Sequence, residues 1–365
     1  LIFMNKILAI CTSPDKGGLE LYFVNMVNHF HFSEKNIVAI CKEDSQILKL
    51  IKSPTIGVTK TSIFNIFYKS YKLASYVNKE NIKVVHVSWT KDLFLAALVK
   101  LFSKKQIKII YHRQMKITRY KKDFYHNFIY KSISVVLVIT KGLLIDCQKY
   151  LPIDNNKIIE LPYGISLPDN NKIYDKKIFL NNLKLKEDIF TIGVFSRIEE
   201  QKGQHLVIEA LNLLSEKNIQ LVVVGHCMDP NYQNGLIEMI DKYKMSHRVA
   251  FAPFIESPMK LMPMLDLIIL PTYEETFGLV VAESMLMGTP VIGSNAGGVP
   301  EIISDNHNGL LFESKSYKSL SEKIISIYKS EELRIKLSNN AKIFASEHYD
   351  YQRHFSKLKS IIQKL

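Results

Sequence analysis

The sequence predicts an α/β protein with two doubly wound parallel sheets. Short runs rich in β-branched residues alternate along the chain with longer stretches that carry the 3.6-residue apolar spacing of helices. Unbroken apolar runs such as IQLVVV are typical of strands that helices cover on both faces. A stretch near residue 170 that is rich in Asn, Lys and Asp interrupts this alternation and separates two series of strands.

Each series supplies enough strands for a domain of its own, and 365 residues suit two domains. We expect domains at residues 1–170 and 171–345, with the wholly helical end, residues 346–365, packing back on the first domain. The strand-like runs of the first half are KILAIC, NIVAIC, IKVVHVS, IKIIYH and SVVLVIT, and those of the second are TIGVFS, IQLVVVG, RVAFAPF, LDLIILP and TPVIGS.

The positive charge of the chain is confined to its first half. The formal net charge is +13, and residues 1–170 hold 25 Lys and Arg against 12 Asp and Glu, whereas the remaining residues hold 23 of each. Such a half suits an acidic partner, namely anionic lipid, nucleic acid or a phosphorylated substrate. A genome rich in A and T, which favours Lys codons, is an equal alternative.

The four cysteines fit neither a disulfide framework nor a CxxC pair, which indicates reduced thiols in the cytosol. The opening LIFMNKILAIC reads as a first strand because its apolar run is too short for a signal sequence. The longest apolar helix candidate, LFLAALVKLF, is short for a membrane span and is broken by Lys100. We therefore expect a cytoplasmic protein, with peripheral contact to the cytosolic face of the inner membrane left open by the basic half.

A turn with two carboxylates follows one strand of the second half. In YEETFGLVVAES, Glu275 lies in the turn, Gly278 begins a helix, and Glu283 comes one to two helical turns later. Ligands of doubly wound folds bind at the carboxyl ends of the strands. The free N–H groups of Gly278, Leu279 and Val280 suit a phosphate, and an ionised carboxylate can accept two hydrogen bonds from a ribose diol.

Two further turns occupy equivalent strand ends. RIEEQKG places Arg197 and Lys202 around a tight loop that ends at Gly203, and NAGGVPE places two glycines before a short helix. Two cations at a strand end can neutralise a diphosphate leaving group as a metal ion does. A solvated loop is the alternative for RIEEQKG alone, and its equivalent position on the sheet edge favours the ligand site.

Together, RIEEQKG, YEETFGLVVAES and NAGGVPE resemble the C-terminal signature of glycosyltransferase family 4, a retaining family with the GT-B fold. Glu275 and Glu283 meet its Glu-x7-Glu spacing, and Arg197 and Lys202 meet its Arg-x4-Lys spacing. Within the family, the bacterial surface-polysaccharide and lipopolysaccharide enzymes are the most similar type. The resemblance implies two Rossmann-like domains facing a central cleft, the first binding the acceptor and the second the nucleotide sugar.

The resemblance also implies roles for single residues. Arg197 and Lys202 contact the diphosphate, Glu275 contacts the transferred sugar near its anomeric centre, and Glu283 binds the ribose. The other implied donor contacts in this domain are Thr276, Phe277, Gly278, Leu279, Val280 and, beside the base, Phe254 and Ile255.

The first domain contributes fewer candidates. Gly17 and Gly18 follow the first strand, where they would let the backbone approach the donor phosphates. His112 ends the strand IKIIYH, at the position where many family members carry a histidine that faces the donor sugar. A histidine that ends a strand is also often a satisfied polar residue, and His86 is a weaker competitor for packing or acceptor contact.

A basic and aromatic stretch, residues 112–131, is the candidate acceptor or membrane surface. Rings beside cations suit an anionic membrane interface, a phosphorylated glycolipid or single-stranded nucleic acid, and a solvated amphipathic helix is the structural alternative. Its candidate contact cations are Arg113, Lys116, Arg119, Lys121 and Lys122.

The combined prediction is a retaining glycosyltransferase that moves a hexosyl group from a nucleotide diphosphate sugar to a glycan or glycolipid acceptor in cell-surface polysaccharide synthesis. UDP-sugars are favoured over GDP-sugars. No Asp-x-Asp metal motif occurs, so we expect no metal and no cofactor. A non-catalytic nucleotide-sugar-binding protein is the alternative, and a nucleic-acid-binding protein is a weaker one, because nucleic acid is not an expected partner of the neutral half.

Overall fold

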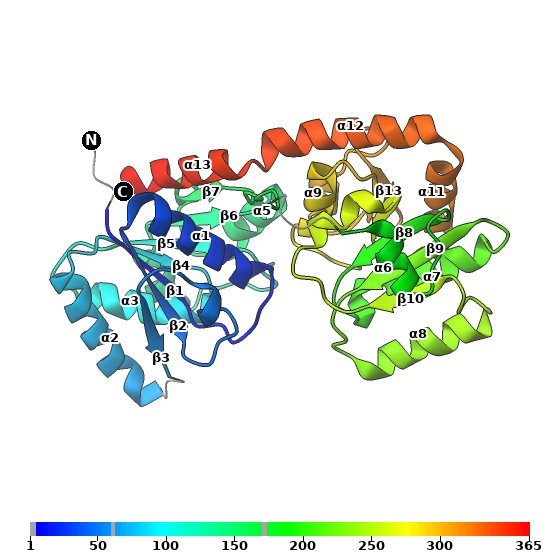
Figure 1. Cartoon of the computed structure of the whole chain (residues 1–365). Coiled ribbons are helices and arrows are strands. Elements are labelled where there is room, and N and C mark those ends of the chain that lie inside the picture. The colour runs from blue at the N-terminus through cyan, green and yellow to red at the C-terminus, as the bar shows by residue number, and fades with distance from the viewer. Residues whose placement is uncertain (1–4, 60–62, 170–173) are drawn as a thin grey trace. The chain divides into compact units, whose positions relative to one another are not determined.

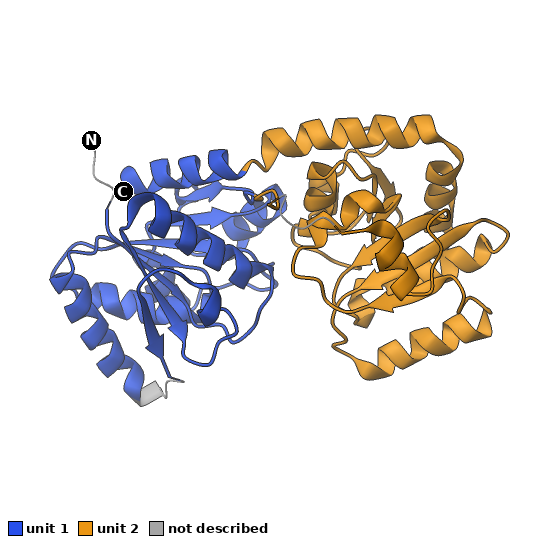
Figure 2. Cartoon of the chain, in the orientation of Figure 1, with its two compact units in different colours: residues 1–164, 351–365 blue, residues 165–350 orange. Residues whose placement is uncertain are grey.

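The computed structural model describes residues 5–59, 63–169 and 174–365. The chain divides into two compact units, shown in Figure 2. Unit 1 comprises Leu1–Gly164 and Tyr351–Leu365, and unit 2 comprises Ile165–Asp350. The boundary expected between residues 170 and 171 lies outside the described residues.

Unit 1 contains a seven-stranded parallel sheet with strand order β3-β2-β1-β4-β5-β6-β7 (Figure 1). All residues of β1 are buried, as expected for a central strand that helices cover on both faces. The chain runs from β1 to one edge of the sheet and returns to the other side of β1 at β4. The strands are β1 (Ile7–Cys11), β2 (Ile37–Lys42), β3 (Thr55–Val58), β4 (Val84–Val87), β5 (Lys108–Arg113), β6 (Val135–Val138) and β7 (Ile158–Glu160).

Helices lie between successive strands along the chain, as the connections of a parallel sheet require. The α-helices of unit 1 are α1 (Gly18–Glu34), α2 (Ile63–Lys79), α3 (Leu93–Phe102), α4 (Phe124–Ser132), α5 (Lys141–Tyr150) and α13 (Tyr351–Gln363). Its 3-10 helices are η1 (Leu48–Leu50), η2 (Thr90–Asp92) and η3 (Asn155–Lys157).

Unit 2 contains a six-stranded parallel sheet with strand order β10-β9-β8-β11-β12-β13. The chain fills one side of β8 with β9 and β10 and then returns to the other side with β11. The strands are β8 (Phe190–Phe195), β9 (Ile219–Val224), β10 (Val249–Ala252), β11 (Leu267–Leu270), β12 (Val291–Ser294) and β13 (Leu310–Phe312).

The space between β8 and β11 is therefore a topological switch point, where doubly wound sheets bind ligands at the carboxyl ends of the strands. The α-helices of unit 2 are α6 (Lys176–Asn182), α7 (Gln204–Leu213), α8 (Pro230–Lys242), α9 (Leu279–Leu286), α10 (Val299–Ile302), α11 (Tyr317–Lys329) and α12 (Glu331–His348). Its 3-10 helices are η4 (Glu200–Lys202), η5 (Pro258–Lys260) and η6 (Met262–Met264).

The predicted fold class, two doubly wound parallel sheets, is confirmed. Every strand-like run of the sequence forms a strand, and the structure adds β3, β7 and β13. These strands lie at the edges of the sheets and have three or four residues each, so they lack the long apolar run that identifies a central strand.

The helical end of the chain belongs to both units. Helix α12 is part of unit 2, whereas α13 is part of unit 1 and packs on α1. Phe355 of α13 is buried, stacks on His29 with 4.1 Å between ring centroids, and meets Phe30 edge-on. Lys359 of α13 pairs with Glu34, the last residue of α1.

We expect Phe355→Ala to destabilise unit 1 by about 3–5 kcal/mol, because truncating a buried aromatic side chain loses its burial and leaves a cavity. Urea unfolding measured by circular dichroism checks this loss. The control Ile343→Ala removes a side chain of α12 that is 61% exposed and should change stability by less than about 0.5 kcal/mol. Equal effects of the two substitutions would mean that α13 does not contribute to the core of unit 1.

Candidate donor site

An ion pair joins the turns that follow β8 and β11 in unit 2. Lys202 ends the 3-10 helix η4, and its Nζ donates to Oε2 of Glu275 over 2.9 Å. Both side chains are largely shielded, with exposures of 18% and 26%. Gly203 closes the first turn with a φ of 69°, and a Cβ there would lie 2.2 Å from the Pro271 carbonyl oxygen. The turn after β8 thus approaches the end of β11 closely. The Lys202 ammonium and the Glu275 carboxylate meet at this switch point.

The glycine pair after β12 supports the turn that carries Glu275. The Gly298 N–H donates to the Glu275 carbonyl oxygen over 2.7 Å. A Cβ on Gly297 would lie 2.1 Å from that oxygen, and a Cβ on Gly298 would lie 2.1 Å from the Thr276 carbonyl oxygen. Only glycine fits at these two positions. The glycine pair of NAGGVPE therefore allows this backbone to pack against the turn of Glu275 and Thr276.

Helix α9 begins directly after this turn. Gly278 is its N-cap, with a left-handed φ of 94° that favours glycine. The Val281 N–H makes the first turn's bond to the Gly278 carbonyl oxygen. The N–H groups of Leu279 and Val280 precede that bond and so belong to the open first turn of the helix, where anions bind. Phe277 is buried beneath the turn against Tyr349.

Glu283 lies in the second turn of α9 with its side chain half-buried. Within the described residues, no protein group donates a hydrogen bond to its carboxylate. Burial raises the pKa of this carboxyl to about 7. A half-buried carboxylate without a protein partner is costly for the fold, and a ligand hydroxyl pair can supply the missing donors.

Arg197 is more exposed than Lys202. Its side chain is 58% exposed and pairs with Glu199 over 2.9 Å. The backbone beneath it is fixed by the buried Gln204, whose Nε2 donates to the Arg197 carbonyl oxygen over 2.8 Å and to Ser196 Oγ over 2.9 Å. The sequence alone did not identify Gln204, because a glutamine at the start of an amphipathic helix reads as an exposed residue.

The predicted base contacts follow β10. Phe254 is 43% exposed and stacks on His226, with ring centroids 4.7 Å apart and an interplanar angle of 11°. Ile255 beside it is half-buried. His226 was missed, although its place just after β9 matches the strand-end positions of the other site residues. The two rings form an exposed aromatic platform, which suits stacking of a planar base.

In unit 1, an internal carboxylate organises the turn of Gly17 and Gly18. The Gly17 N–H donates to Glu20 Oε2 over 2.9 Å, and Ser13 Oγ donates to the other carboxylate oxygen. The Gly17 N–H is therefore already bonded to a carboxylate. This carboxylate lies at the turn where we predicted that the backbone approaches the donor phosphates. The GGLE sequence contained the signal, because a glutamate at the third position of a helix can accept from the N–H of the residue that precedes the helix.

Across the switch point of unit 1, Asp92 fixes the end of β1. Thr12 donates to both oxygens of this carboxylate, from its N–H over 2.8 Å and from its hydroxyl. Burial raises the pKa of Asp92 to about 6. This buried aspartate after β4 was not identified from the sequence.

His112 and His86 are both fully buried in unit 1. Their rings lie 5.9 Å apart, and within the described residues none of their four ring nitrogens has a hydrogen-bond partner. Burial lowers the pKa of His86 to about 3 and that of His112 well below its usual value, so both rings are neutral. Each neutral ring therefore carries one N–H donor and one acceptor nitrogen that no group of the described residues uses.

One member of the basic stretch is placed differently from the prediction. Arg113 is the last residue of β5 and is buried. Its guanidinium donates to the Thr90 and Tyr111 hydroxyls and to the carbonyl oxygens of Met115 and Lys116. The structure does not support Arg113 as an acceptor or membrane contact, because the residue is buried and each of its three guanidinium nitrogens already donates inside the protein.

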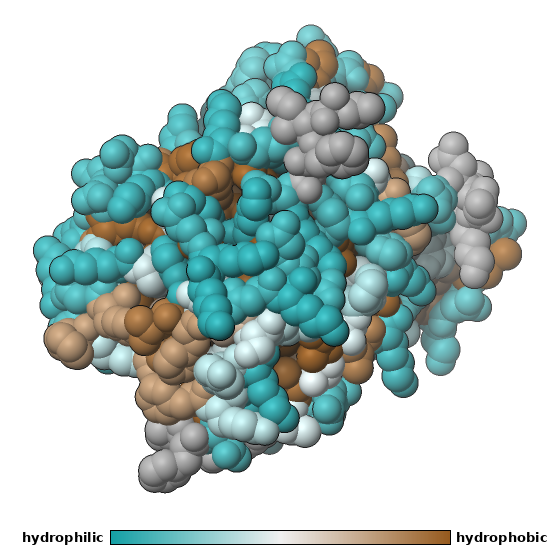
Figure 3. Space-filling view, turned by 90° about the vertical axis from the view of Figure 1, so that its left-hand side faces the viewer, coloured by the Kyte–Doolittle hydropathy of each residue, from teal (hydrophilic) through white to brown (hydrophobic). Residues whose placement is uncertain are grey.

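The other four predicted contact cations lie in the irregular segment between β5 and α4, and only the end of the stretch, from Phe124, is helical. Lys116, Arg119 and Lys122 are exposed, and Lys121 is half-buried. Tyr120 and Phe124 beside them are 56% and 91% exposed. Figure 3, which faces the side of unit 1, shows hydrophobic side chains scattered among hydrophilic ones.

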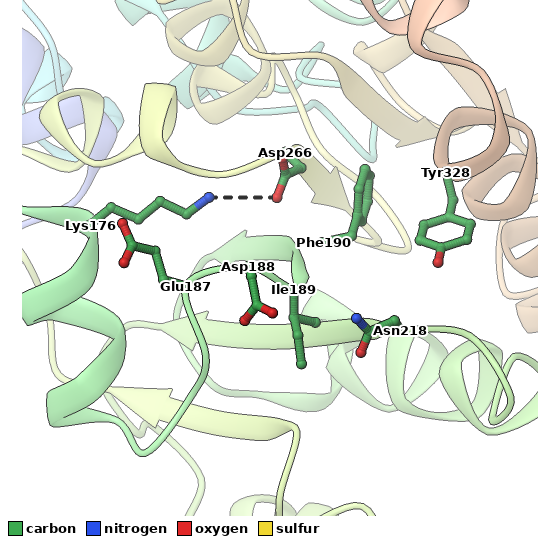
Figure 4. Close-up of a pocket in the computed structure, with 8 residues that line it drawn as sticks. All are labelled: Lys176, Glu187, Asp188, Ile189, Phe190, Asn218, Asp266 and Tyr328. Carbon is green, nitrogen blue, oxygen red and sulfur yellow. Dashed lines mark ion pairs between the residues drawn. The ribbon is translucent and has the colours of Figure 1, made fainter.

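A polar cavity of unit 2 lies at the other end of the strands from these turns. Figure 4 shows Lys176 and Asp266 across its rim, 4.0 Å apart, with Phe190 and Tyr328 on one side. Phe190 begins β8, so the cavity lies at the amino ends of the strands, away from the turns described above. It takes no part in the site.

Comparison with known proteins matches these turns to a family. Residues 175–344 match the family described as "Glycosyl transferases group 1". The chain is 25% identical over 307 residues to the O-antigen biosynthesis glycosyltransferase WclY of Escherichia coli, covering 80% of each chain. It is 24% identical over 300 residues to the N-acetyl-alpha-D-glucosaminyl L-malate synthase of Bacillus anthracis, covering 80% of this chain and 77% of that one.

Two solved structures share the fold over nearly the whole chain. Anabaena Alr3699/HepE, solved in complex with UDP and glucose, has a TM-score of 0.85 at 20% identity and covers 99% of this chain and 100% of its own. A glycosyltransferase from Rickettsia africae has a TM-score of 0.90 at 20% identity and covers 99% and 98%. The fold is GT-B, and residues 175–344 of unit 2 match the group 1 glycosyltransferases, as the motifs RIEEQKG, YEETFGLVVAES and NAGGVPE predicted.

We expect Gly298→Ala to displace the turn at Thr276 and to lower both the melting temperature and the affinity for any nucleotide sugar, because the new Cβ cannot fit beside a backbone oxygen. Differential scanning fluorimetry with and without nucleotide sugars measures both effects. Gly235→Ala is the matched control, since no atom lies within 4 Å of a Cβ there. In the middle of α8 it should stabilise the protein by about 0.5–1 kcal/mol. Unchanged ligand binding by Gly298→Ala would remove this turn from the site.

Proposed function

We propose that this glycosyltransferase moves a hexosyl group from a nucleotide diphosphate sugar to a glycan or glycolipid acceptor, with retention of anomeric configuration and without a metal ion. UDP-sugars are the favoured donors. The relatives named for O-antigen and capsular polysaccharide biosynthesis support a role in the synthesis of a bacterial surface glycan. The solved structure with UDP and glucose, and another of the same protein with UDP-glucose, support the donor class.

One observation carries the proposal: the Lys202–Glu275 pair and the unpartnered Glu283 lie on adjacent turns at the switch point of unit 2. Lys202 provides positive charge where a diphosphate would leave. Glu283 provides two acceptors for a ribose diol, and the first turn of α9 provides N–H groups for a phosphate or the sugar. Arg197, which is 58% exposed and paired with Glu199, adds a second cation.

The proposed chemistry uses charge stabilisation. Lys202 and Arg197 stabilise the diphosphate as the bond between the anomeric carbon and its oxygen breaks, which replaces a divalent cation. The acceptor hydroxyl attacks on the same face, and its proton passes to the leaving phosphate. Glu275 holds hydroxyls of the sugar near the anomeric centre, and neutral His112 hydrogen-bonds to the substrate from unit 1.

The remaining cations of the basic stretch are proposed to meet an acidic acceptor or membrane. Lys116, Arg119 and Lys122 flank the exposed rings of Tyr120 and Phe124, a combination that suits anionic lipid headgroups. Within the part of the chain that the structure describes, no helix is both long and apolar enough to cross a bilayer. We propose a cytoplasmic enzyme with peripheral contact to the inner membrane.

The test of the function is a panel of UDP-, GDP- and ADP-sugars, with magnesium and with EDTA. We expect one nucleotide class to raise the melting temperature and to be hydrolysed slowly, at the same rate with EDTA. Lys202→Ala should lose roughly 100-fold or more in turnover, because a cation at the leaving group is removed. Binding without turnover would support the non-catalytic alternative, and a covalent sugar on Glu275 would contradict same-face transfer.

The raised pKa of Glu283 predicts a dependence of donor affinity on pH. If the ionised carboxylate binds the ribose, only about a tenth of the protein is competent at pH 6, so the dissociation constant should rise about tenfold between pH 8 and pH 6. Glu283→Gln should bind the donor weakly and equally at both values. Isothermal titration calorimetry with the selected donor makes the comparison, and a parent that binds equally at both pH values speaks against ionised Glu283 in the site.

The raised pKa of Glu283 also makes the stability of the protein depend on pH. The folded state raises this pKa from 4.5 to about 7, so the folded protein binds the proton more tightly than the unfolded chain. Stability is therefore lost as pH rises from 4.5 to 7. We expect Glu283→Gln to be more stable than the parent at pH 8, by about 3 kcal/mol, and equally stable at pH 4. Urea unfolding at both pH values measures this difference.

The membrane contact predicts binding to vesicles that contain phosphatidylglycerol and no binding to neutral phosphatidylcholine. Phe124→Ser should weaken binding about tenfold, because burial of an aromatic ring in the headgroup region is lost. Phe32→Ser is the control, since Phe32 is 68% exposed on α1, outside the basic stretch. Flotation assays measure both. Stronger binding to single-stranded DNA than to vesicles would favour the nucleic-acid alternative.

A further inference from the structure

Helix α13 introduces a histidine into the interior of unit 1. His354 is 5% exposed, and its Nδ1 lies 2.7 Å from the Pro162 carbonyl oxygen. A carbonyl oxygen can only accept, so Nδ1 carries the hydrogen. Burial lowers the pKa of His354 to about 4, which leaves the ring neutral and its Nε2 an acceptor.

The acceptor nitrogen of His354 fixes a tyrosine of α1. The Tyr22 hydroxyl lies 2.9 Å from His354 Nε2 and donates to it. Tyr22 is 5% exposed, so this hydroxyl needs a partner inside the protein. The bond joins α1 to α13, and the backbone at Gly164 passes so close to His354 that a Cβ there would lie 2.5 Å from the histidine Cβ.

The ring of Tyr22 in turn meets His112. The two ring centroids are 4.6 Å apart and the planes are inclined by 80°, an edge-to-face contact. Within the described residues no hydrogen bond holds either nitrogen of His112, so packing alone sets the orientation of this imidazole. Tyr22 supplies the nearest ring contact, and His86 supplies a more distant one at 5.9 Å.

We propose that His354 and Tyr22 are positioning residues for His112, so that the C-terminal helix helps to set the geometry of the transfer reaction. The Pro162 carbonyl fixes the tautomer of His354, His354 fixes the Tyr22 hydroxyl, and the Tyr22 ring fixes the His112 ring. The inference rests on the proposed role of His112 in transfer. It gives α13 a part in function in addition to its packing through Phe355.

Two substitutions of His354 separate its two hydrogen bonds. An asparagine amide reaches the position of Nδ1, so His354→Asn keeps a donor to Pro162 and loses the acceptor for Tyr22. A glutamine amide reaches the position of Nε2, so His354→Gln keeps an acceptor for Tyr22 and loses the donor to Pro162. Tyr22→Phe removes the hydroxyl and keeps the ring.

The experiment measures kcat and KM for hydrolysis of the UDP-sugar that stabilises the parent most, together with melting temperatures. We expect Tyr22→Phe and His354→Asn each to lower kcat roughly tenfold with little change in KM, since misplacing a catalytic group slows the chemical step. The double variant should be no slower than either single one, because both remove the same bond. His354→Gln should keep most of the parent kcat.

His112→Ala separates failure of the inference from failure of the proposed function. If His112→Ala loses activity while Tyr22→Phe and His354→Asn keep the parent kcat and lose only thermal stability, the pair is structural and the inference is overturned. Equal losses in His354→Gln and His354→Asn overturn it as well. If His112→Ala retains full activity, the proposed role of His112 is wrong and the inference falls with it.

Discussion

The close approach of three backbone turns in unit 2 is the constraint on which the candidate site depends. Gly203 packs against the carbonyl of Pro271, and Gly297 and Gly298 pack against the carbonyls of Glu275 and Thr276. A side chain at any of these glycines would separate turns that follow different strands. Because the turns touch, charges that are far apart in sequence, such as Lys202 and Glu275, can lie within hydrogen-bonding distance. The glycines serve geometry here, and the charged residues supply the chemistry.

Two of the predicted site residues, one in each unit, have polar groups without a protein partner in the part of the chain that the structure describes. Glu283 is a half-buried carboxylate without a protein donor among the described residues, and His112 is a buried imidazole without a hydrogen-bond partner there. Each costs stability, because desolvation is not offset by a protein contact. Other buried polar side chains make protein hydrogen bonds, as Asp92 does with Thr12 and as the Gln204 Nε2 does with the turn of Arg197.

The sequence predicted the fold class well because apolar runs such as IQLVVV have a clear length and burial, and because glycines and charges recur at strand ends. It could not predict contacts that depend on tertiary packing. Arg113 reads as a surface cation beside Lys116, yet its position at the end of β5 turns its guanidinium inward. His354 reads as one polar residue of an amphipathic helix, and only the packing of α13 on α1 joins it to Tyr22. The edge strands β3, β7 and β13 were not predicted because each has only three or four residues.

The division of the chain also bears on its folding. Unit 2 is continuous in sequence, from Ile165 to Asp350, whereas unit 1 includes Tyr351–Leu365. The packing of α13 on α1 therefore joins residues as far as 325 positions apart, as in the pair of Lys359 with Glu34, and closing so long a loop costs chain entropy. Ile165 and Asp350, the first and last residues of unit 2, form a β-bridge. Folding of unit 2 thus brings together the two ends of the inserted segment and shortens the loop that unit 1 has to close.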